Sequence, residues 1–157
     1  MSTEKYKSIA SKLKFEGRAY INGKYVDAVD GEKFETINPA NGDILCSVAK
    51  CNQKDVDLAV QSSRKAFDSG VWSRTSPEHR KEVLLKFAKL LSKEGEENSV
   101  LESVDTGKLI VDCINEVAND APMHFQWYGE LIDKVFGKVG PTDPSITSLV
   151  VKEPIGV

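Results

Sequence analysis

The feature that most constrains this fold is the order in which two hydrophobic periods occur along the chain. Short β-prone segments come first, between residues 19 and 48, and helical spacing then runs from residue 53 to residue 135. A single β-prone segment follows, at 146–151. Helices with one apolar face must cover another layer, but the chain has no series of continuous apolar strands typical of a buried parallel sheet. The order predicts the helical layer of an α/β fold whose central sheet is encoded beyond residue 157.

The last residues favour the same interpretation. Residues 148–157 read as one strand and the opening of another, and the sequence closes on Ile155-Gly156-Val157 without polar residues after them. Chain ends usually lie at the surface and tend to fray. We therefore expect the 157 residues to be the front portion of a longer protein.

Two β-hairpins are predicted near the beginning of the chain. Asn22-Gly23 lies between two β-prone runs, and both residues tolerate the positive φ of a type I′ turn. A second pair of strands is predicted at 34–37 and 44–48, because the intervening residues 38–43 are dense in turn formers.

Four helices are predicted after the hairpins. Asn52 is a candidate N-cap of the first helix, which ends near Gly70, and Ser76 caps the second. The third helix stops before Gly107, and the long fourth helix contains Pro122, which should kink or split it. The expected buried face of the second helix consists of Val83, Leu84, Phe87, Leu90 and Leu91.

Composition and charge exclude several classes of protein. The net charge is −3 and the basic residues are dispersed among acids, which argues against a nucleic-acid partner. No apolar run approaches the roughly 18 residues of a membrane span, and the N-terminus lacks the pattern of a secretory signal. Cys46, Cys51 and Cys113 have no metal-like spacing. These features predict free thiols and a cytoplasmic location, without a membrane.

Candidate catalytic chemistry is sparse in this chain. Neither G-x-G-x-x-G nor G-x-x-x-x-G-K-[ST] occurs, so no phosphate-binding loop is predicted. His79 and His124 have no acid positioned by sequence to complete a triad, and no helix N-terminus or base lies clearly beside Cys46 or Cys51 to activate the thiol. We therefore assign no catalytic and no cofactor-binding residue.

The turn Asp105-Thr106-Gly107-Lys108 is the most distinctive polar segment. It is either a simple cap between two helices or part of an oxygen-rich cation site, because a carboxylate and nearby carbonyls are hard ligands.

Several strings, taken together and in order, resemble the N-terminal third of the NAD(P)-dependent aldehyde dehydrogenase superfamily. They are YINGKYV at 20–26, INPANG at 37–42, DVDLAV at 55–60, Phe67 with Trp72-Ser73, SPEHR at 76–80, LESVDTGK at 101–108, WYGELIDK at 127–134 and EPIGV at 153–157. The segments at 76–80 and 127–134 are most similar to the branch that acts on γ-aminobutyraldehyde and γ-glutamyl amino-aldehydes.

The resemblance implies oxidation of an aldehyde to a carboxylic acid through a cysteine thiohemiacetal, with NAD or NADP accepting the hydride. In the family, the nucleophile, the general base, the oxyanion-stabilising Asn and the nucleotide contacts all follow the EPIGV string. The resemblance therefore implies that the 157-residue chain alone binds no cofactor and is inactive.

Two minor sites are also implied by the resemblance. The family often holds a monovalent cation between the carbonyl that matches Ile37 and the acid that matches Asp105. The region 120–125 together with Trp127 and Tyr128 is similar to a wall of the substrate tunnel, in which Asp120 departs from an apolar lining.

The predicted organisation has three parts. Residues 1–18 form a polar leader or short helix, 19–137 the N-terminal part of the cofactor-binding domain, and 138–157 the start of an oligomerisation arm. Two functions remain open: a fragment of the enzyme, or a non-catalytic module that pairs with a full-length relative. In both cases we expect self-association or pairing with the remainder.

Overall fold

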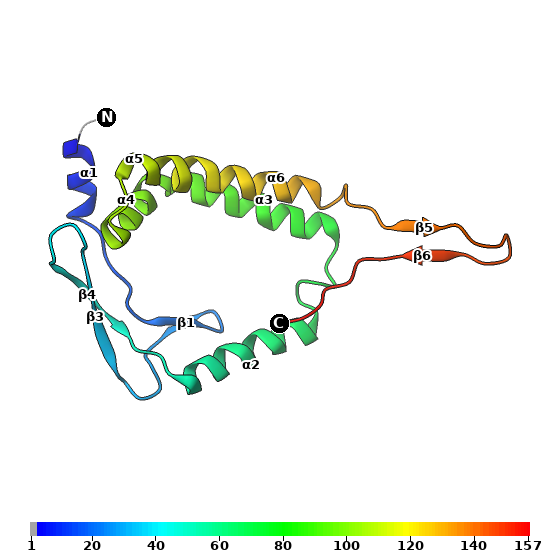
Figure 1. Cartoon of the computed structure of the whole chain (residues 1–157), viewed down its shortest axis with the longest axis horizontal. Helices are drawn as coiled ribbons and strands as arrows, with labels where there is room; N and C mark the ends of the chain where they lie inside the picture. The colour runs from blue at the N-terminus through cyan, green and yellow to red at the C-terminus, as the bar shows by residue number, and fades with distance from the viewer. Residues whose placement is uncertain (1–2) are drawn as a thin grey trace.

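The computed structural model describes residues 3–157, so the first two residues of the predicted leader lie outside the described residues. Three antiparallel hairpins and a helical layer make up the described chain (Figure 1). The leader contains α1 (Thr3–Ala10), which packs against α4 (Gly95–Thr106). None of the described helices combines the length and apolar character needed to cross a bilayer.

Both N-terminal hairpins predicted from the sequence are confirmed. The first consists of β1 (Ala19–Ile21) and β2 (Lys24–Val26), and its turn residues Asn22 and Gly23 have φ of 51° and 75°. The second consists of β3 (Lys33–Ile37) and β4 (Ile44–Ala49). Its register shifts between the last two residues of β3, which bends the strand end.

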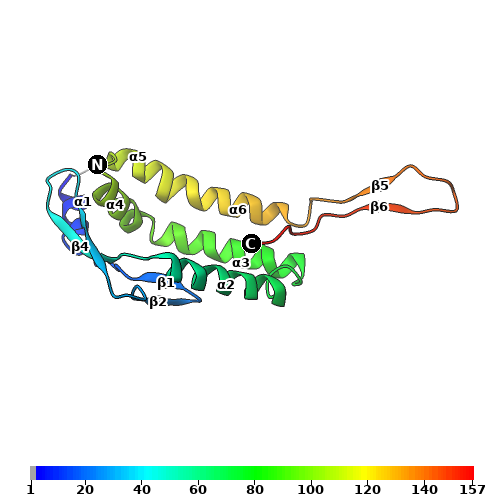
Figure 2. The same cartoon turned by 60° about the horizontal axis from the view of Figure 1, so that its bottom comes forward.

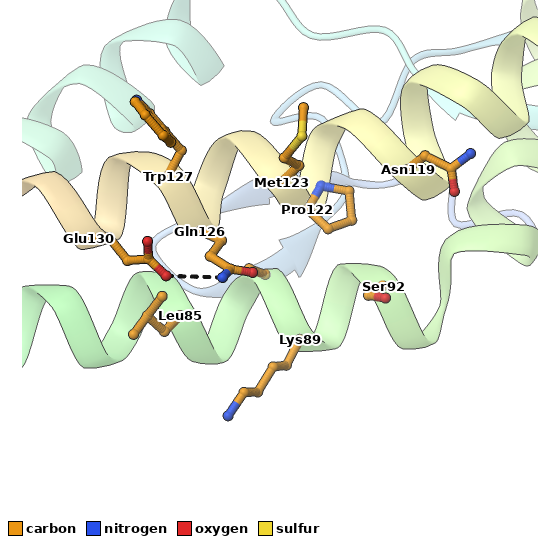
Figure 3. A pocket seen from close by; sticks show the side chains of 10 residues that line it. Leu85, Lys89, Ser92, Asn119, Pro122, Met123, Gln126, Trp127 and Glu130 are labelled. Carbon is orange, nitrogen blue, oxygen red and sulfur yellow. Dashed lines mark hydrogen bonds between the residues drawn. The ribbon is translucent and has the colours of Figure 1, made fainter.

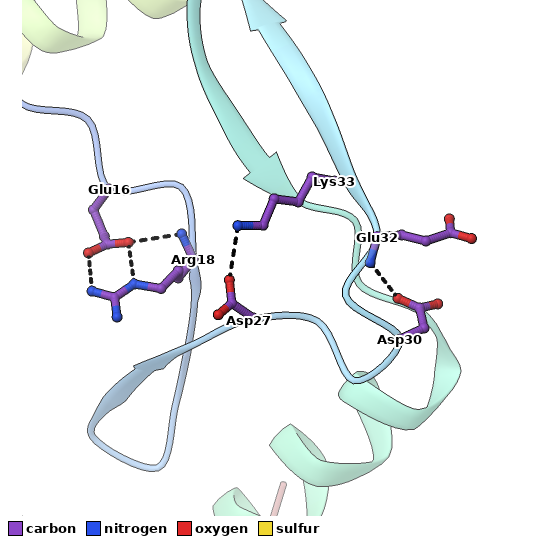
Figure 4. Close-up of polar contacts among 6 residues, drawn as sticks. All are labelled: Glu16, Arg18, Asp27, Asp30, Glu32 and Lys33. Atoms are coloured by element: carbon purple, nitrogen blue, oxygen red, sulfur yellow. Dashed lines mark hydrogen bonds and ion pairs between the residues drawn. The ribbon is translucent and has the colours of Figure 1, made fainter.

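Exposed polar contacts surround these hairpins (Figure 4). Arg18 and Glu16 form a two-pronged ion pair with a shortest distance of 2.7 Å, and Lys33 pairs with Asp27 at 3.2 Å. Such exposed pairs contribute little individually to stability. The hairpins therefore depend on their local turn geometry and on backbone pairing.

Helix α2 (Gln53–Ser69) begins and ends where the sequence predicts. The Asn52 side chain accepts from the Lys54 N–H at 2.8 Å, and the buried Asp55 carboxylate accepts from the Asn52 N–H at 2.9 Å. Asp55 also accepts from the Val29 N–H at 2.9 Å, which ties the chain after β2 to the helix. Gly70 ends α2 with a φ of 69°.

The next helices are also confirmed. Ser76 accepts the His79 N–H at 3.1 Å and opens α3 (Pro77–Lys93), and Gly107, with a φ of 75°, ends α4. Helix α3 lies alongside α6 (Ala121–Leu131) through much of its length (Figures 1 and 2).

The long fourth helix changes its type instead of breaking at the proline. It starts as α5 (Ile110–Cys113), continues as a π-helix η1 (Ile114–Asp120) and becomes α6. The Ala121 N–H bonds to the Glu116 carbonyl, five residues earlier. Because Pro122 has no N–H and crowds the turn before it, the wider π turn accommodates it without a break.

The C-terminal hairpin corrects the predicted strand boundaries. It pairs β5 (Lys138–Gly140) with β6 (Ser148–Val150), and it projects away from the helices (Figure 1). The predicted strand at 146–151 is therefore shorter, and residues 138–140, for which no strand was predicted, form its partner. The sequence does not indicate a strand here, because glycine and proline are depleted in strands and this segment contains or adjoins Gly137, Gly140 and Pro141.

The predicted burial of the α3 face is met only in part: Leu84 and Leu91 are half-buried, whereas the other three residues are exposed. Val83, Phe87 and Leu90 are 39%, 41% and 50% exposed, and large apolar side chains also lie exposed on α2 and α6. No two described strands pair in parallel. The faces stay open because no sheet within residues 3–157 covers them. Cys113, in contrast, is fully buried, as its position on an apolar helical face predicts.

Candidate cation site and substrate-facing helix

The two residues predicted to hold a cation come from elements that meet in space. Ile37 is the last residue of β3, and Asp105 is the penultimate residue of α4. The Thr36 hydroxyl donates to the Asp105 carboxylate at 3.4 Å. The ring of Pro39 would lie 2.8 Å from a Cβ placed on Gly107. The end of β3 and the end of α4 therefore lie side by side.

The donor chemistry at this junction fits a hard cation. A hydroxyl, a carboxylate and backbone carbonyls are all oxygen ligands, and the C-terminal end of α4 adds a partial negative charge. Residues 3–157 contain no group of three or more His, Cys, Asp or Glu side chains that could hold a metal ion. Because the donors comprise one carboxylate, a hydroxyl and neutral carbonyls, they suit a monovalent cation better than a divalent one.

The turn after Asp105 is held at several points. The Ser103 hydroxyl donates to the Lys108 carbonyl at 2.7 Å, and the Thr106 hydroxyl donates to the Glu102 carbonyl at 2.7 Å. The Lys108 ammonium forms an ion pair with Glu116 in η1. The hydrogen bond to Glu116 raises the pKa of Lys108 above its ordinary value. The turn therefore connects α4 to the π segment through side-chain contacts.

The outer face of η1 and α6 carries the residues predicted to line a substrate tunnel. Asp120, Met123 and Trp127 follow helical spacing and are exposed, Met123 by 58% and Trp127 by 61%. Within the described chain, the Asp120 carboxylate has no hydrogen-bond or ion-pair partner, whereas its backbone carbonyl lies 2.8 Å from Nδ1 of His124. An unpaired carboxylate on a helical face that also carries an exposed aromatic side chain favours a cationic ligand.

A groove of about 640 Å³ runs between α3 and this face (Figure 3). Met123 and Trp127 project away from α3 at its rim, and Gln126 donates to Glu130 at 2.9 Å. Lys89 extends outward from the opposite helix. The groove has both polar and apolar walls, and neither a cysteine nor a histidine is among the residues that line it.

The thiols and imidazoles form no catalytic constellation within residues 3–157. Cys113 is fully buried, and burial raises the pKa of its thiol. Cys46 lies in β4 and Cys51 is exposed beyond the strand. Sequence reasoning did not anticipate the contact between Lys108 and Glu116. The proline inside a long helical pattern was the only signal of unusual geometry nearby.

Comparison with known proteins identifies the family. A family model described as "Aldehyde dehydrogenase family" matches residues 25–157. Aminoacetaldehyde dehydrogenase of Pseudomonas aeruginosa is 40% identical over 157 residues, which is 100% of this chain and 32% of the relative.

Solved structures agree with the sequence relatives. γ-Glutamyl-γ-aminobutyraldehyde dehydrogenase of Burkholderia cenocepacia superposes with a TM-score of 0.95 at 40% identity, covering 99% of this chain and 32% of that structure. An indole-3-acetaldehyde dehydrogenase complexed with NAD+ gives 0.94 at 40% identity, again covering 99% and 32%.

The chain spans about a third of the length of these relatives, and the matched third is their N-terminal part. The fold is correspondingly the N-terminal portion of the aldehyde dehydrogenase fold, as the sequence strings predict. With the family model matching residues 25–157, the chain belongs to the aldehyde dehydrogenase family.

Proposed function

We propose that residues 1–157 form the N-terminal part of an NAD(P)-dependent dehydrogenase that oxidises an amino-aldehyde to a carboxylic acid. The observation that carries this proposal is the likeness over the whole chain to aminoacetaldehyde and γ-glutamyl-γ-aminobutyraldehyde dehydrogenases. Both of those relatives are named for aldehydes derived from amines.

The unpaired carboxylate of Asp120 supports a substrate with a positive charge. An ammonium group near this face would gain Coulomb attraction to Asp120, and a cation lying over Trp127 would gain roughly 0.5–2 kcal/mol from the ring. Both side chains lie on one helical face and are exposed. We assign Asp120 to charge recognition and Trp127 to contact with the substrate body.

The nicotinamide cofactor would supply the hydride acceptor when bound. None of residues 3–157 forms a glycine-rich phosphate loop, and we assign none of them to the nucleotide or to the reacting carbon. The buried Cys113 is unsuited to nucleophilic attack because its thiol is inaccessible and its raised pKa disfavours the thiolate. The chain alone is therefore expected to show no dehydrogenase activity.

We further propose that residues 19–137 belong to the cofactor-binding domain and that 138–157 begin an oligomerisation arm in a cytoplasmic enzyme. Support comes from the projecting hairpin of β5 and β6 and from the open apolar faces of the helices (Figure 1). The remainder of the family fold would cover those faces.

A chimera tests the proposed function. Residues 1–157 would be joined, after the segment 153–157, to the remaining sequence of the Burkholderia cenocepacia relative. We expect the chimera to reduce NAD+ in the presence of amino-aldehydes, and the 157-residue chain to be inactive.

Substitution of Asp120 then tests the substrate class. In the chimera, Asp120→Asn should raise KM for an amino-aldehyde by about tenfold, equivalent to about 1.4 kcal/mol, and leave KM for a neutral aldehyde unchanged. Asp57→Asn, which removes the same charge from exposed α2, is the matched control. Equal KM values for Asp120→Asn and the unsubstituted chimera would refute charge recognition by this residue.

A second candidate is a non-catalytic module that pairs with a full-length relative, and the exposed apolar faces favour it. Mixing the 157-residue chain with the intact Burkholderia cenocepacia enzyme distinguishes this module from a fragment of an enzyme. A stable complex seen by light scattering, together with an inactive chimera, would favour the module.

A further inference from the structure

We propose that Arg64 of α2 is a positioning residue for the dehydrogenase reaction. It anchors the segment 153–157 to α2 and so sets where the remainder of the family fold joins the helical layer. The effect on the reaction rests on the proposed function, whereas the anchoring itself does not. Contacts of the Arg64 guanidinium with the segment and with α2 support it.

The guanidinium contacts two consecutive residues of the segment. Nη2 of Arg64 donates to the Val157 carbonyl at 3.0 Å, which joins residues 93 positions apart. A Cβ placed on Gly156 would lie 3.5 Å from Nη1 and 3.6 Å from Nη2 of the same group. Gly156 has a φ of 143°, which side chains rarely adopt and glycine adopts readily. The backbone can therefore turn the Val157 carbonyl toward Arg64.

The orientation of Arg64 is fixed by its own helix. Its Cζ lies 5.4 Å from the centroid of the Phe67 ring, and its Nη1 lies 3.8 Å from the Asp68 carboxylate, one helical turn further along α2. A planar guanidinium can stack on an aromatic ring and still donate from its edge, which a lysine ammonium cannot do. The side chain is thus held on α2 with one edge available to the segment.

The beginning of the segment also lies against the end of α2 (Figure 1). Glu153 and Pro154 line a hollow of about 490 Å³, and its other walls are Phe67, Asp68, Ser73 and Arg74. Ile155 is fully exposed and contributes no burial. Within residues 3–157, the bond from Arg64 is the one hydrogen bond that residues 153–157 make. Anchoring of the segment therefore depends mainly on Arg64.

The segment connects two parts to which we assign different tasks. Charge recognition is assigned to Asp120 and Trp127, whereas no described residue is assigned to the reacting carbon. The relatives are about three times as long as this chain, so their sequences continue after the residues that match 153–157. A displacement of about 1 Å can lower a rate about 100-fold by misaligning the reacting groups. Loss of the Arg64 anchor should therefore lower kcat and leave binding of the substrate charge intact.

The experiment measures kcat and KM of the chimera with an amino-aldehyde and with a neutral aldehyde. Arg64→Ala should lower kcat about tenfold with both substrates and leave both KM values unchanged, because Arg64 contacts the chain and not the substrate. Arg64→Lys should recover little of this loss, since an ammonium group does not stack on Phe67 in the same way. Lys65→Ala removes the same charge from the next exposed position of α2 and, as the matched control, should leave kcat unchanged.

Two further measurements separate positioning from a general loss of structure. Hydrogen exchange in peptides covering residues 153–157 should be faster in Arg64→Ala than in Lys65→Ala, with exchange in α3 and α6 the same in both. Arg64→Ala combined with Gly156→Ala should lower kcat no further than the larger of the two single effects, because both substitutions break the same contact.

The outcomes distinguish failure of the anchor from failure of the proposed function. Unchanged kcat in Arg64→Ala, or exchange at 153–157 equal to that of Lys65→Ala, would overturn the proposal. Losses of kcat that multiply in the double variant, or faster exchange throughout α3 and α6, would also overturn it. Faster exchange confined to 153–157 and lower kcat, in a chimera without preference for amino-aldehydes, would support the anchor while refuting the proposed substrate class.

Discussion

Ser99 shows how single residues hold this helical layer together. Its side chain is fully buried, and its hydroxyl lies 2.7 Å from the Gly95 carbonyl and 3.1 Å from the Cys113 carbonyl. A buried polar group left without a partner costs about 1–3 kcal/mol. The hydroxyl therefore both stabilises α4 and fixes α5 against it.

We expect Ser99→Ala to lower the free energy of unfolding of the chimera by about 1–3 kcal/mol, because the Cys113 carbonyl loses its buried partner. Denaturant unfolding measures this loss. Ser92→Ala, an exposed serine on α3, should change stability by less than about 0.5 kcal/mol. Equal effects of the two substitutions would contradict a special role for the buried hydroxyl.

The dependence of stability on acid pH also rests on single residues, here on Asp133. Hydrogen bonds from Lys134 and from Lys81 lower the pKa of Asp133 from 3.8 to about 2. A lowered pKa contributes stability that is present above the ordinary value and is lost as the pH falls through about 2. Unfolding of the chimera between about pH 4.5 and pH 2 should therefore be less pH-dependent in Asp133→Asn than in Asp57→Asn. The same slope in both variants would show that the ion pairs of Asp133 do not form in solution.

At the scale of elements, local rules predicted most of the structure. Asn22-Gly23, Asn52, Ser76 and Gly107 lie at the turns and caps that their chemistry favours, because these positions depend on neighbouring backbone alone. The π segment was not predicted, because it depends on packing against two other helices, α3 and α4, and produces no periodic pattern in the sequence. The approach of Asp105 to β3 came from family likeness, as no local rule relates residues 69 positions apart.

Close packing between elements gives a further prediction. A Cβ on Gly95 would lie 2.9 Å from the Cα of Ala118, so α4 and η1 would have to separate. Alanine normally stabilises a helix by about 0.5–1 kcal/mol relative to glycine, whereas overpacking costs about 1–3 kcal/mol. Gly95→Ala should therefore destabilise the chimera, and Glu97→Ala, which truncates an exposed side chain in the first turn of the same helix, should not. Thermal unfolding that ranks Gly95→Ala above the parent would refute the close approach.

At the scale of the molecule, open apolar surface is the dominant property. Val56 and Val60 on α2 are 49% and 52% exposed, and Leu90 on α3 is 50% exposed. Each large aliphatic side chain that becomes fully buried contributes roughly 1.5–3 kcal/mol. The free energy forgone by leaving several such side chains uncovered is therefore comparable to the whole free energy of unfolding of a domain, about 5–15 kcal/mol.

The 157-residue chain should consequently self-associate or form a loosely packed globule when purified alone. Size-exclusion chromatography with light scattering measures its mass, and denaturant unfolding measures its cooperativity. A monodisperse monomer of 17.3 kDa with a sharp transition would show that these helices close a core of their own.

The contact between Thr36 and Asp105 also has a kinetic consequence. Because it joins residues 69 positions apart, it forms after the local hairpins and helical turns have been made. A ligand that binds there stabilises an arrangement absent from the early, partly ordered chain, so it acts mainly on the rate of unfolding. In the chimera, a monovalent cation such as potassium should leave the slopes of both arms of the chevron plot unchanged. It should lower the unfolding rate and leave the folding rate unchanged.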